Sequence, residues 1–141
     1  KPVSVLLAKR AAPLCSIKPS DTVFSALQLL AQHEVGALVV MEGTKLVGVI
    51  SERDYTRKIA LQGKSSKDAT VDSIMTRNVL VVSPSSGTRV CMAIMREKKI
   101  RHLPVVEGEK VLGMLSIRDL MDDLIAEHEF TIAQLESYIN S

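Results

Sequence analysis

The chain has 141 residues, of which 46% are hydrophobic and 24% are charged, and its formal net charge is +2. This composition excludes a disordered chain and favours one compact domain, or two small units that share a core. The net charge is too weak to indicate binding to nucleic acid or to a membrane. The chain contains no run of about 18 apolar residues, so no membrane span is predicted. Only 3% of the residues are aromatic, which argues against a stacking platform for single-stranded nucleic acid.

The first predicted elements are a short apolar helix or lead-in at residues 3–7 and a strand over residues 14–17, which Lys18 and Pro19 end. A helix follows, and Ser20 or Asp21 can cap it, because a short side-chain oxygen accepts hydrogen bonds from backbone N–H groups there. Its apolar face is formed by residues at helical spacing, namely Val23, Ala26, Leu27 and Leu30.

A hairpin comes next in the chain. Apolar runs at residues 37–41 and 45–50 flank a turn at residues 42–44, where Gly43 supplies the positive φ that such turns require. A second helix is predicted to start near Asp54 and to run to about Leu61. We expect a first unit over residues 3–63, with the order strand–helix–strand–strand–helix, and a polar linker over residues 64–70.

The second half of the chain repeats this order. Residues 36–54 align with residues 101–119 at an offset of 65, and nine of these nineteen positions are identical, where chance gives about one. The repeat predicts a strand at residues 79–82 that is buried on both faces, because its residues are continuously apolar. We expect this second unit over residues 71–128, so any account of function must explain two copies.

The tail after the repeat, residues 129–141, predicts a further helix that starts near Phe130. Thr131 and Gln134 have the spacing of a capping box. Ile132, Leu135 and Ile139 form an apolar stripe, which either docks on its own protomer or forms a dimer contact.

Residues with catalytic chemistry are few and scattered. Cys15 and Cys91 have no paired spacing, so we interpret them as reduced, buried thiols, with a regulatory disulfide as the alternative. His33, His102 and His128 lie in no metal-binding motif, and the chain has neither a P-loop nor a GxGxxG sequence. We therefore expect no enzymatic activity, no catalytic residue, no metal and no catalytic cofactor.

Two strand–helix–strand–strand–helix units that each end in G-h-h-S-x-x-D, at residues 48–54 and 113–119, resemble the cystathionine β-synthase (CBS) domain family. The stretch at residues 100–106 looks like the family's second-strand signature, and the resemblance covers about residues 3–128. It implies an α+β fold, in which a tandem pair of βαββα CBS units is related by pseudo-twofold symmetry and carries an extra C-terminal helix. It also implies homodimers that form a flat disc, and clefts between the units that bind AMP, ADP, ATP, NAD(H) or S-adenosylmethionine.

The chemistry of the repeated motif suits such ligands. An ionised carboxylate, Asp54 or Asp119, can accept two hydrogen bonds from ribose hydroxyls. Ser51 and Ser116 can donate a hydroxyl proton to phosphate, and Arg53 and Arg118 can neutralise its charge. Gly48 and Gly113 are expected to let the backbone approach the ligand closely. The alternative is that the aspartates only cap helices and that the arginines are solvated surface charges.

The resemblance also implies that each cleft combines residues of both units. Beside Asp54 it places Val79 and Leu80 against adenine, with three basic side chains near phosphate: Arg101, His102 and Arg118. Beside Asp119 it places Ile17, Lys18, Val35 and Gly36. Because Gly36 and Ala37 stand where Arg101 and His102 stand in the repeat, we expect the Asp54 cleft to be the more basic and to bind nucleotide more tightly.

These features predict a regulatory module that senses energy or redox state by binding an adenine nucleotide and that modulates an unknown partner protein. The alternative is a nucleotide-independent scaffold for protein interaction. Nucleic-acid binding is the weaker interpretation of the basic residues between 77 and 101, since they fit a solvated helix face, and we expect no membrane partner. The expected location is the cytoplasm, or an organelle (mitochondrion or plastid) if a targeting segment has been removed.

Overall fold

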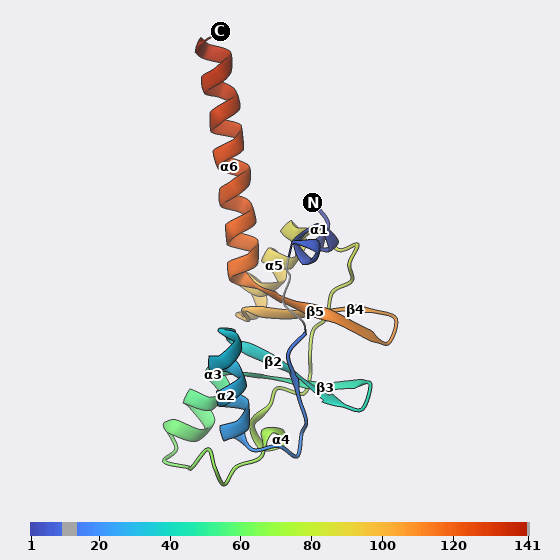
Figure 1. Ribbon diagram of the computed structural model, residues 1–141, viewed down its shortest axis with the longest axis vertical. Helices are drawn as coiled ribbons and strands as arrows, with labels where there is room; N and C mark the ends of the chain where they lie inside the picture. The colour runs from blue at the N-terminus through green and yellow to red at the C-terminus, as the bar shows by residue number, and fades with distance from the viewer. Residues whose placement is uncertain (10–13, 141) are drawn as a thin grey trace.

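The computed structural model describes residues 1–9 and 14–140. Its first half contains α1 (Val3–Ala8), β1 (Ser16–Ile17), α2 (Val23–His33), β2 (Ala37–Glu42), β3 (Lys45–Ser51), α3 (Glu52–Tyr55) and a π-helical turn, η1 (Thr56–Ala60). Its second half contains α4 (Val71–Ile74), α5 (Thr88–Lys98), β4 (His102–Glu107), β5 (Lys110–Ser116) and α6 (Ile117–Asn140). The predicted α+β tandem of two similar units is confirmed, and Figure 1 shows their hairpins, β2–β3 and β4–β5, one above the other.

The two hairpins repeat each other in register. In the first, Leu38 pairs with Ile50 and Val40 with Gly48, and in the second every partner lies 65 residues later. Gly43 and Gly108 occupy the turns with φ of 63° and 62°, a conformation that glycine adopts without steric cost. The strand β1 adds to the first hairpin in parallel, with Ile17 beside Val40.

The strand expected at residues 79–82 is absent from the part of the chain that the structure describes. Only Val82 forms a bridge, to Val105, and Leu80 and Val81 are 43% and 47% exposed. The prediction of burial on both faces was therefore wrong. Val79 and Leu80 lie along an open cleft and are not covered by a second layer, whereas Val82 is buried in the core of the second unit.

Each unit has its own hydrophobic core, but the short leading helices are exchanged between the two. Val3 and Leu6 of α1 pack with Leu103 and Leu115 of the second hairpin. In the same way Val71, Ile74 and Met75 pack in the core around Leu38 and Ile50. In sequence order α1 lies in the unit expected at residues 3–63, yet it completes the core of the other one.

Backbone hydrogen bonds hold the exchanged helices in equivalent places. The N–H of Val3 donates to the carbonyl of Ser86 at 2.8 Å, and the N–H of Val71 donates to the carbonyl of Asp21 at 2.8 Å. Cys91 is fully buried in the second core, and burial raises the pKa of its thiol. No disulfide joins it to Cys15, which is only half-buried; the expectation that both thiols are buried thus holds for Cys91 alone.

The helix α6 is continuous from Ile117 to Asn140, and it extends away from both units (Figure 1). The prediction of a separate helix from Phe130 was wrong. Neither glycine nor proline interrupts the chain there, so the preceding helix continues through this residue. The Thr131 hydroxyl donates to the carbonyl of Glu127 at 3.0 Å, inside the helix, instead of capping a new one. The apolar stripe of the tail does not dock on its own protomer: Ile132, Leu135 and Ile139 are 54%, 58% and 78% exposed.

Although α6 is long, no helix in the described ranges is both long and apolar enough to cross a membrane.

Candidate functional site

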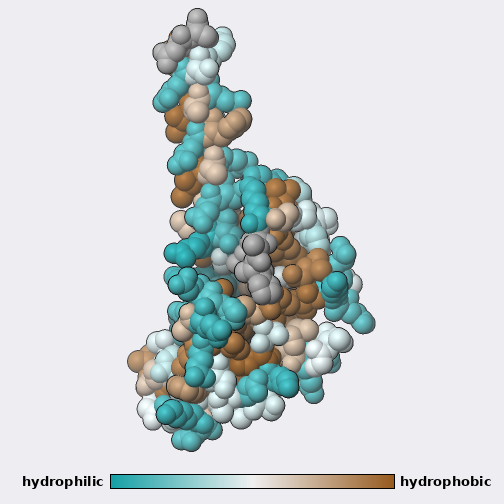
Figure 2. Space-filling model, viewed as in Figure 1, coloured by the Kyte–Doolittle hydropathy of each residue, from teal (hydrophilic) through white to brown (hydrophobic). Residues whose placement is uncertain are grey.

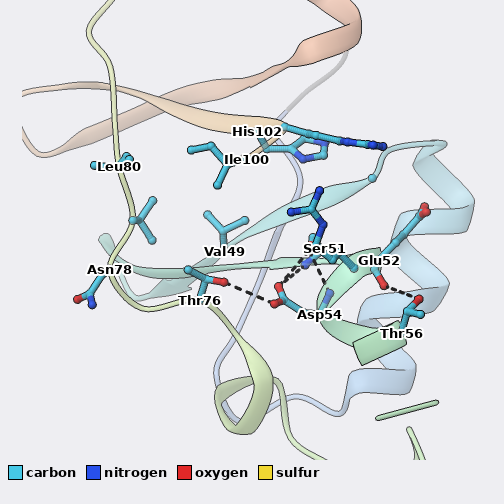
Figure 3. Close-up of a pocket in the computed structure, with 14 residues that line it drawn as sticks. Val49, Ser51, Glu52, Asp54, Thr56, Thr76, Asn78, Leu80, Ile100 and His102 are labelled. Carbon is cyan, nitrogen blue, oxygen red and sulfur yellow. Dashed lines mark hydrogen bonds between the residues drawn. The ribbon is translucent and has the colours of Figure 1, made fainter. Parts of the chain in front are cut away.

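A cleft of about 470 Å³ lies between the two units, and we call it the Asp54 cleft (Figure 3). The structure brings together there most of the side chains that the sequence assigned to this cleft, from both halves of the chain. Its lining residues are Gly36, Val49, Ser51, Glu52, Arg53, Asp54, Thr56, Thr76, Asn78, Val79, Leu80, Ile100, Arg101 and His102.

The Asp54 carboxylate is held by several donors. Its Oδ2 accepts from the backbone N–H of Ser51 at 3.0 Å and from the Ser51 hydroxyl at 3.1 Å. Its Oδ1 lies 3.1 Å from Nζ of Lys58 and accepts from the Thr76 hydroxyl at 3.5 Å. The bond from Thr76 is the longest of these (Figure 3), so a ribose hydroxyl can replace it at little cost.

The same carboxylate has a structural role, because Ser51 caps α3 and Asp54 completes a capping box. The cap is thus Ser51, and Asp54 is its partner at the third helical position. The Ser51 hydroxyl gives its only proton to Asp54, so donating to phosphate would require breaking that bond. In the second unit Asp119 repeats the pattern, accepting from the N–H and the hydroxyl of Ser116 at 2.8 and 2.9 Å.

The basic side chains of the Asp54 cleft come from both units. Nη1 of Arg53 donates to the carbonyl of Lys99 at 2.8 Å, which ties the start of α3 to the end of α5. Arg101 is exposed beside it, and His102 is half-buried. Arg118 does not line this cleft: it follows β5, at the place where Arg53 follows β3, and lines the equivalent cleft on the other side.

The apolar wall of the Asp54 cleft includes two residues that sequence reasoning missed. Val49 and Ile100 line it together with Val79 and Leu80. Sequence reasoning missed Thr76 as well, which pairs with Val49 of β3. The backbone N–H of Val49 donates to the carbonyl of Thr76 at 3.0 Å, and the N–H of Thr76 donates to the carbonyl of Val49 at 2.9 Å. The alternation of β3 gave one signal, since Val49 and Ser51 lie on the same face of a strand.

A second cleft, of about 810 Å³, contains Ser116, Arg118 and Asp119, and we call it the Asp119 cleft. Val35 and Gly36 line it as expected, but Ile17 and Lys18 do not, because Ile17 points into the first core. Their places are taken by Leu14 and Cys15, which lie 65 residues before Val79 and Leu80. The repeat register could have found them.

The two clefts share residues at their boundary. Gly36, Arg101 and His102 line both, so Arg101 and His102 do not belong to the Asp54 cleft alone, as the sequence suggested. A Cβ atom added to Gly36 would lie 3.2 Å from Cε1 of His102. Glycine at this position therefore lets the histidine of one unit pack against the backbone of the other.

The two glycines of the repeated motif serve packing. A Cβ atom at Gly48 would lie 2.7 Å from Sδ of Met75 and 2.9 Å from the carbonyl oxygen of Thr76, and one at Gly113 would lie 3.1 Å from Cδ2 of Leu7. The space beside each glycine is filled by a residue of an exchanged helix or its flank. This packing requires glycine at both positions whether or not a ligand is bound, and Gly113 also lines the second cleft described above.

No group of three or more histidine, cysteine, aspartate or glutamate side chains among the described residues could hold a metal ion.

Comparison with known proteins gives a family match over both units. The CBS domain model matches residues 10–61 and 71–126. The mitochondrial CBS domain-containing protein CBSX3 of Arabidopsis thaliana is 41% identical over 124 residues, which are 84% of this chain and 60% of that protein. The present chain therefore spans less than two thirds of that relative.

Solved structures agree with the fold. A protein with CBS domains from Burkholderia ambifaria is 40% identical, with a TM-score of 0.86 over 89% of this chain and 95% of that one. A CBS-domain protein from Agrobacterium tumefaciens is 31% identical, with a TM-score of 0.82 over 87% of this chain and 98% of the other.

Proposed function

The chain belongs to the CBS domain family, and we propose that it is a regulatory module that binds an adenine nucleotide (AMP, ADP, ATP or NAD) between its two units. The observation that carries this proposal is the composition of the Asp54 cleft. One cleft brings together an apolar wall, a fixed carboxylate and basic side chains, which are the three groups that adenine, ribose and phosphate require.

Each part of such a ligand has a partner in the cleft. Adenine fits between Val79 and Leu80 on one side and Ile100 on the other. The ribose hydroxyls donate to Asp54, whose capping bonds keep the carboxylate in place. The phosphate groups lie toward Arg101, with His102 and the remaining N–H groups of Arg53 beside them.

A solved relative supports the ligand class. A CBS domain pair in complex with 5′-methylthioadenosine and S-adenosyl-L-methionine shares this fold at 23% identity, with a TM-score of 0.79. Both of those ligands contain adenosine, which is also the common part of AMP, ADP, ATP and NAD. We infer that the present clefts accept the same adenosine group.

We propose that the Asp54 cleft binds nucleotide more tightly than the Asp119 cleft. Each is lined by two arginines, Arg101 being common to both. The Asp119 cleft is also lined by His33 and by a further carboxylate, that of Glu34, and a carboxylate there opposes phosphate.

Regulation would follow from the position of the ligand between the units. A nucleotide that contacts both units favours the arrangement that it fits, and it can change a surface only through such a difference in affinity. We propose that this change is sensed by a partner protein and that the chain forms a homodimer. A related structure, of the CBS-CP12 protein from bloom-forming cyanobacteria, is hexameric.

We assign no catalytic activity to the chain and propose no membrane or nucleic-acid partner. The cytoplasm is the proposed location. An organelle is the alternative, because the relative at 41% identity is a mitochondrial protein. The second candidate function is a scaffold that docks a partner without nucleotide. The exposed second half of α6 favours this alternative, since its side chains at residues 127–139 are not covered by the described residues.

Isothermal titration separates the two functions. Protein freed of carried-over ligand by unfolding and refolding is expected to bind AMP, ADP, ATP or NAD, and to bind GMP and CMP at least about tenfold more weakly, a difference of about 1.4 kcal/mol. The reason is that an apolar wall offers no hydrogen-bond partner to the different polar groups of guanine, and that the smaller cytosine covers less of the wall. Absence of heat with all four adenine nucleotides, from protein with a native circular dichroism spectrum, would leave only the scaffold function.

A further inference from the structure

A groove of about 790 Å³ lies between α5 and the first half of α6, and we call it the basic groove. Its floor is apolar and includes Met92, Ile117 and Leu124. Its rim carries five exposed cations and, among the residues that line the groove, no acidic side chain: Arg53, Arg89, Arg96, Lys99 and Arg101. Such a surface fits a partner that is apolar on one side and acidic beside it.

The projecting half of α6, residues 127–139, has that composition. Ile132, Leu135 and Ile139 form one apolar stripe at spacings of three and four residues. The stripe continues through His128 to Ile125 and Met121 in the first half of the helix. Between residues 119 and 141 the sequence contains acidic residues but neither lysine nor arginine. Figure 2 shows apolar and polar side chains side by side along this helix, where it projects beyond the rest of the molecule.

We propose that the projecting half of α6 from a second copy of the chain occupies the basic groove, and that the exchange is reciprocal. A patch that contains both the groove and the segment that fills it can form a twofold-symmetric interface, which closes after two copies. This proposal rests on the homodimer proposed above and names its contact surface. It does not depend on nucleotide.

Charge complementarity decides between this occupant and the other ways of covering α6. Two tails paired only with each other would bring Glu129 and Glu136 near the same residues of the other copy, with no lysine or arginine of the tail to neutralise them. In the groove the same glutamates face Arg89 and Arg96 of α5, while the isoleucines cover the apolar floor. Only the second arrangement pairs the acidic helix and the basic rim within one assembly.

The geometry of the fold is consistent with this exchange. The groove lies beside Ile117 and Leu124, in the first half of α6, whereas the segment that fills it is the second half. Reciprocal exchange therefore places the two α6 helices antiparallel. A helix of 24 residues is about 36 Å long, so its second half reaches well beyond its own unit.

Charge reversal with sedimentation tests the proposal. The double variant Glu129→Lys/Glu136→Lys and the double variant Arg89→Glu/Arg96→Glu are each expected to raise the Kd of the dimer by about tenfold or more, since each places like charges opposite each other. Mixing the two variants in equal amounts is expected to restore a mixed dimer, because the reversed tail of one copy meets the reversed groove of the other and the second contact is wild type. The decisive protein carries all four changes, so that both contacts are complementary between identical copies. It is expected to recover a Kd within about threefold of the wild type.

The control changes two glutamates in the hairpin regions away from the groove, Glu42→Lys/Glu107→Lys, and is expected to leave the Kd of the dimer unchanged. The assignment of the groove would be overturned if neither charge-reversed double variant weakened the dimer. It would also be overturned if the variant with all four changes did not restore the dimer. A wild-type chain that sediments only as a monomer would overturn the groove and the homodimer together. Titration with AMP of the same variants reports the proposed nucleotide binding separately, because none of the changed residues lines the Asp54 cleft.

Discussion

Replacing Asp54 by alanine is expected to weaken AMP binding at least tenfold. The change removes the acceptor of two ribose hydroxyls, and a hydrogen bond to a charged group contributes about 1.5–3 kcal/mol, so the loss of one such bond already corresponds to about a factor of ten. Isothermal titration of the variant against the wild type measures this effect. The same change is also expected to lower the free energy of unfolding by about 1 kcal/mol, because it breaks the capping box with Ser51.

The repeat supplies a matched control for this experiment. Asp119→Ala breaks the equivalent bonds with Ser116 and is expected to cost similar stability, but it leaves the Asp54 cleft intact. If Asp119→Ala abolishes the tight site while Asp54→Ala preserves it, the assignment of the tighter cleft is wrong. If both variants lose thermal stability and neither loses affinity, the aspartates serve only the helix caps.

Replacing Leu6 by alanine is expected to destabilise the second unit, although Leu6 lies in the first part of the sequence. Its side chain is 6% exposed and packs in the core with Leu103 and Leu115. Truncating a buried leucine costs about 2–5 kcal/mol through lost burial and the cavity left behind. Hydrogen exchange should therefore accelerate at amides of β4 and β5 more than at those of β2 and β3.

The reciprocal change is Ile74→Ala, in the other exchanged helix. It is expected to loosen β2 and β3 instead, because Ile74 packs in the first core. Leu61→Ala, at a residue that is 76% exposed, should change stability by less than about 0.5 kcal/mol. If Leu6→Ala and Ile74→Ala each loosened the unit in which they lie by sequence order, the exchange of leading helices would be disproved.

The repeat made much of the fold predictable. The offset of 65 residues predicted two matching hairpins, and the turn glycines and alternating apolar residues located them. These features are local, because a turn and its two strands lie close together in the sequence. The exchange of α1 and α4 is a non-local contact. Val3 and Val71 look equally apolar in sequence, and nothing in their own neighbourhood tells which core each will enter.

The errors at the site have related physical causes. Residues 79–82 were predicted to form a buried strand because apolar runs favour burial, whereas in the fold Val79 and Leu80 line an open cleft. Arg118 was assigned to the Asp54 cleft and Lys18 to the Asp119 cleft because the family resemblance implies that each cleft combines residues of both units. The register of the repeat, applied strictly, would have assigned Arg118 to the Asp119 cleft and replaced Ile17 and Lys18 by Leu14 and Cys15. The sequence also could not predict that Arg53 donates to Lys99 across the units, since that contact depends on how the units pack.

A crystal structure of the protein with saturating AMP tests the central claim most directly. We expect adenine to lie against Val79, Leu80 and Ile100, a ribose hydroxyl to replace Thr76 at Oδ1 of Asp54, and phosphate to lie near Arg101. Density for AMP away from the space between the two units, or clefts that stay empty at saturation, would contradict it.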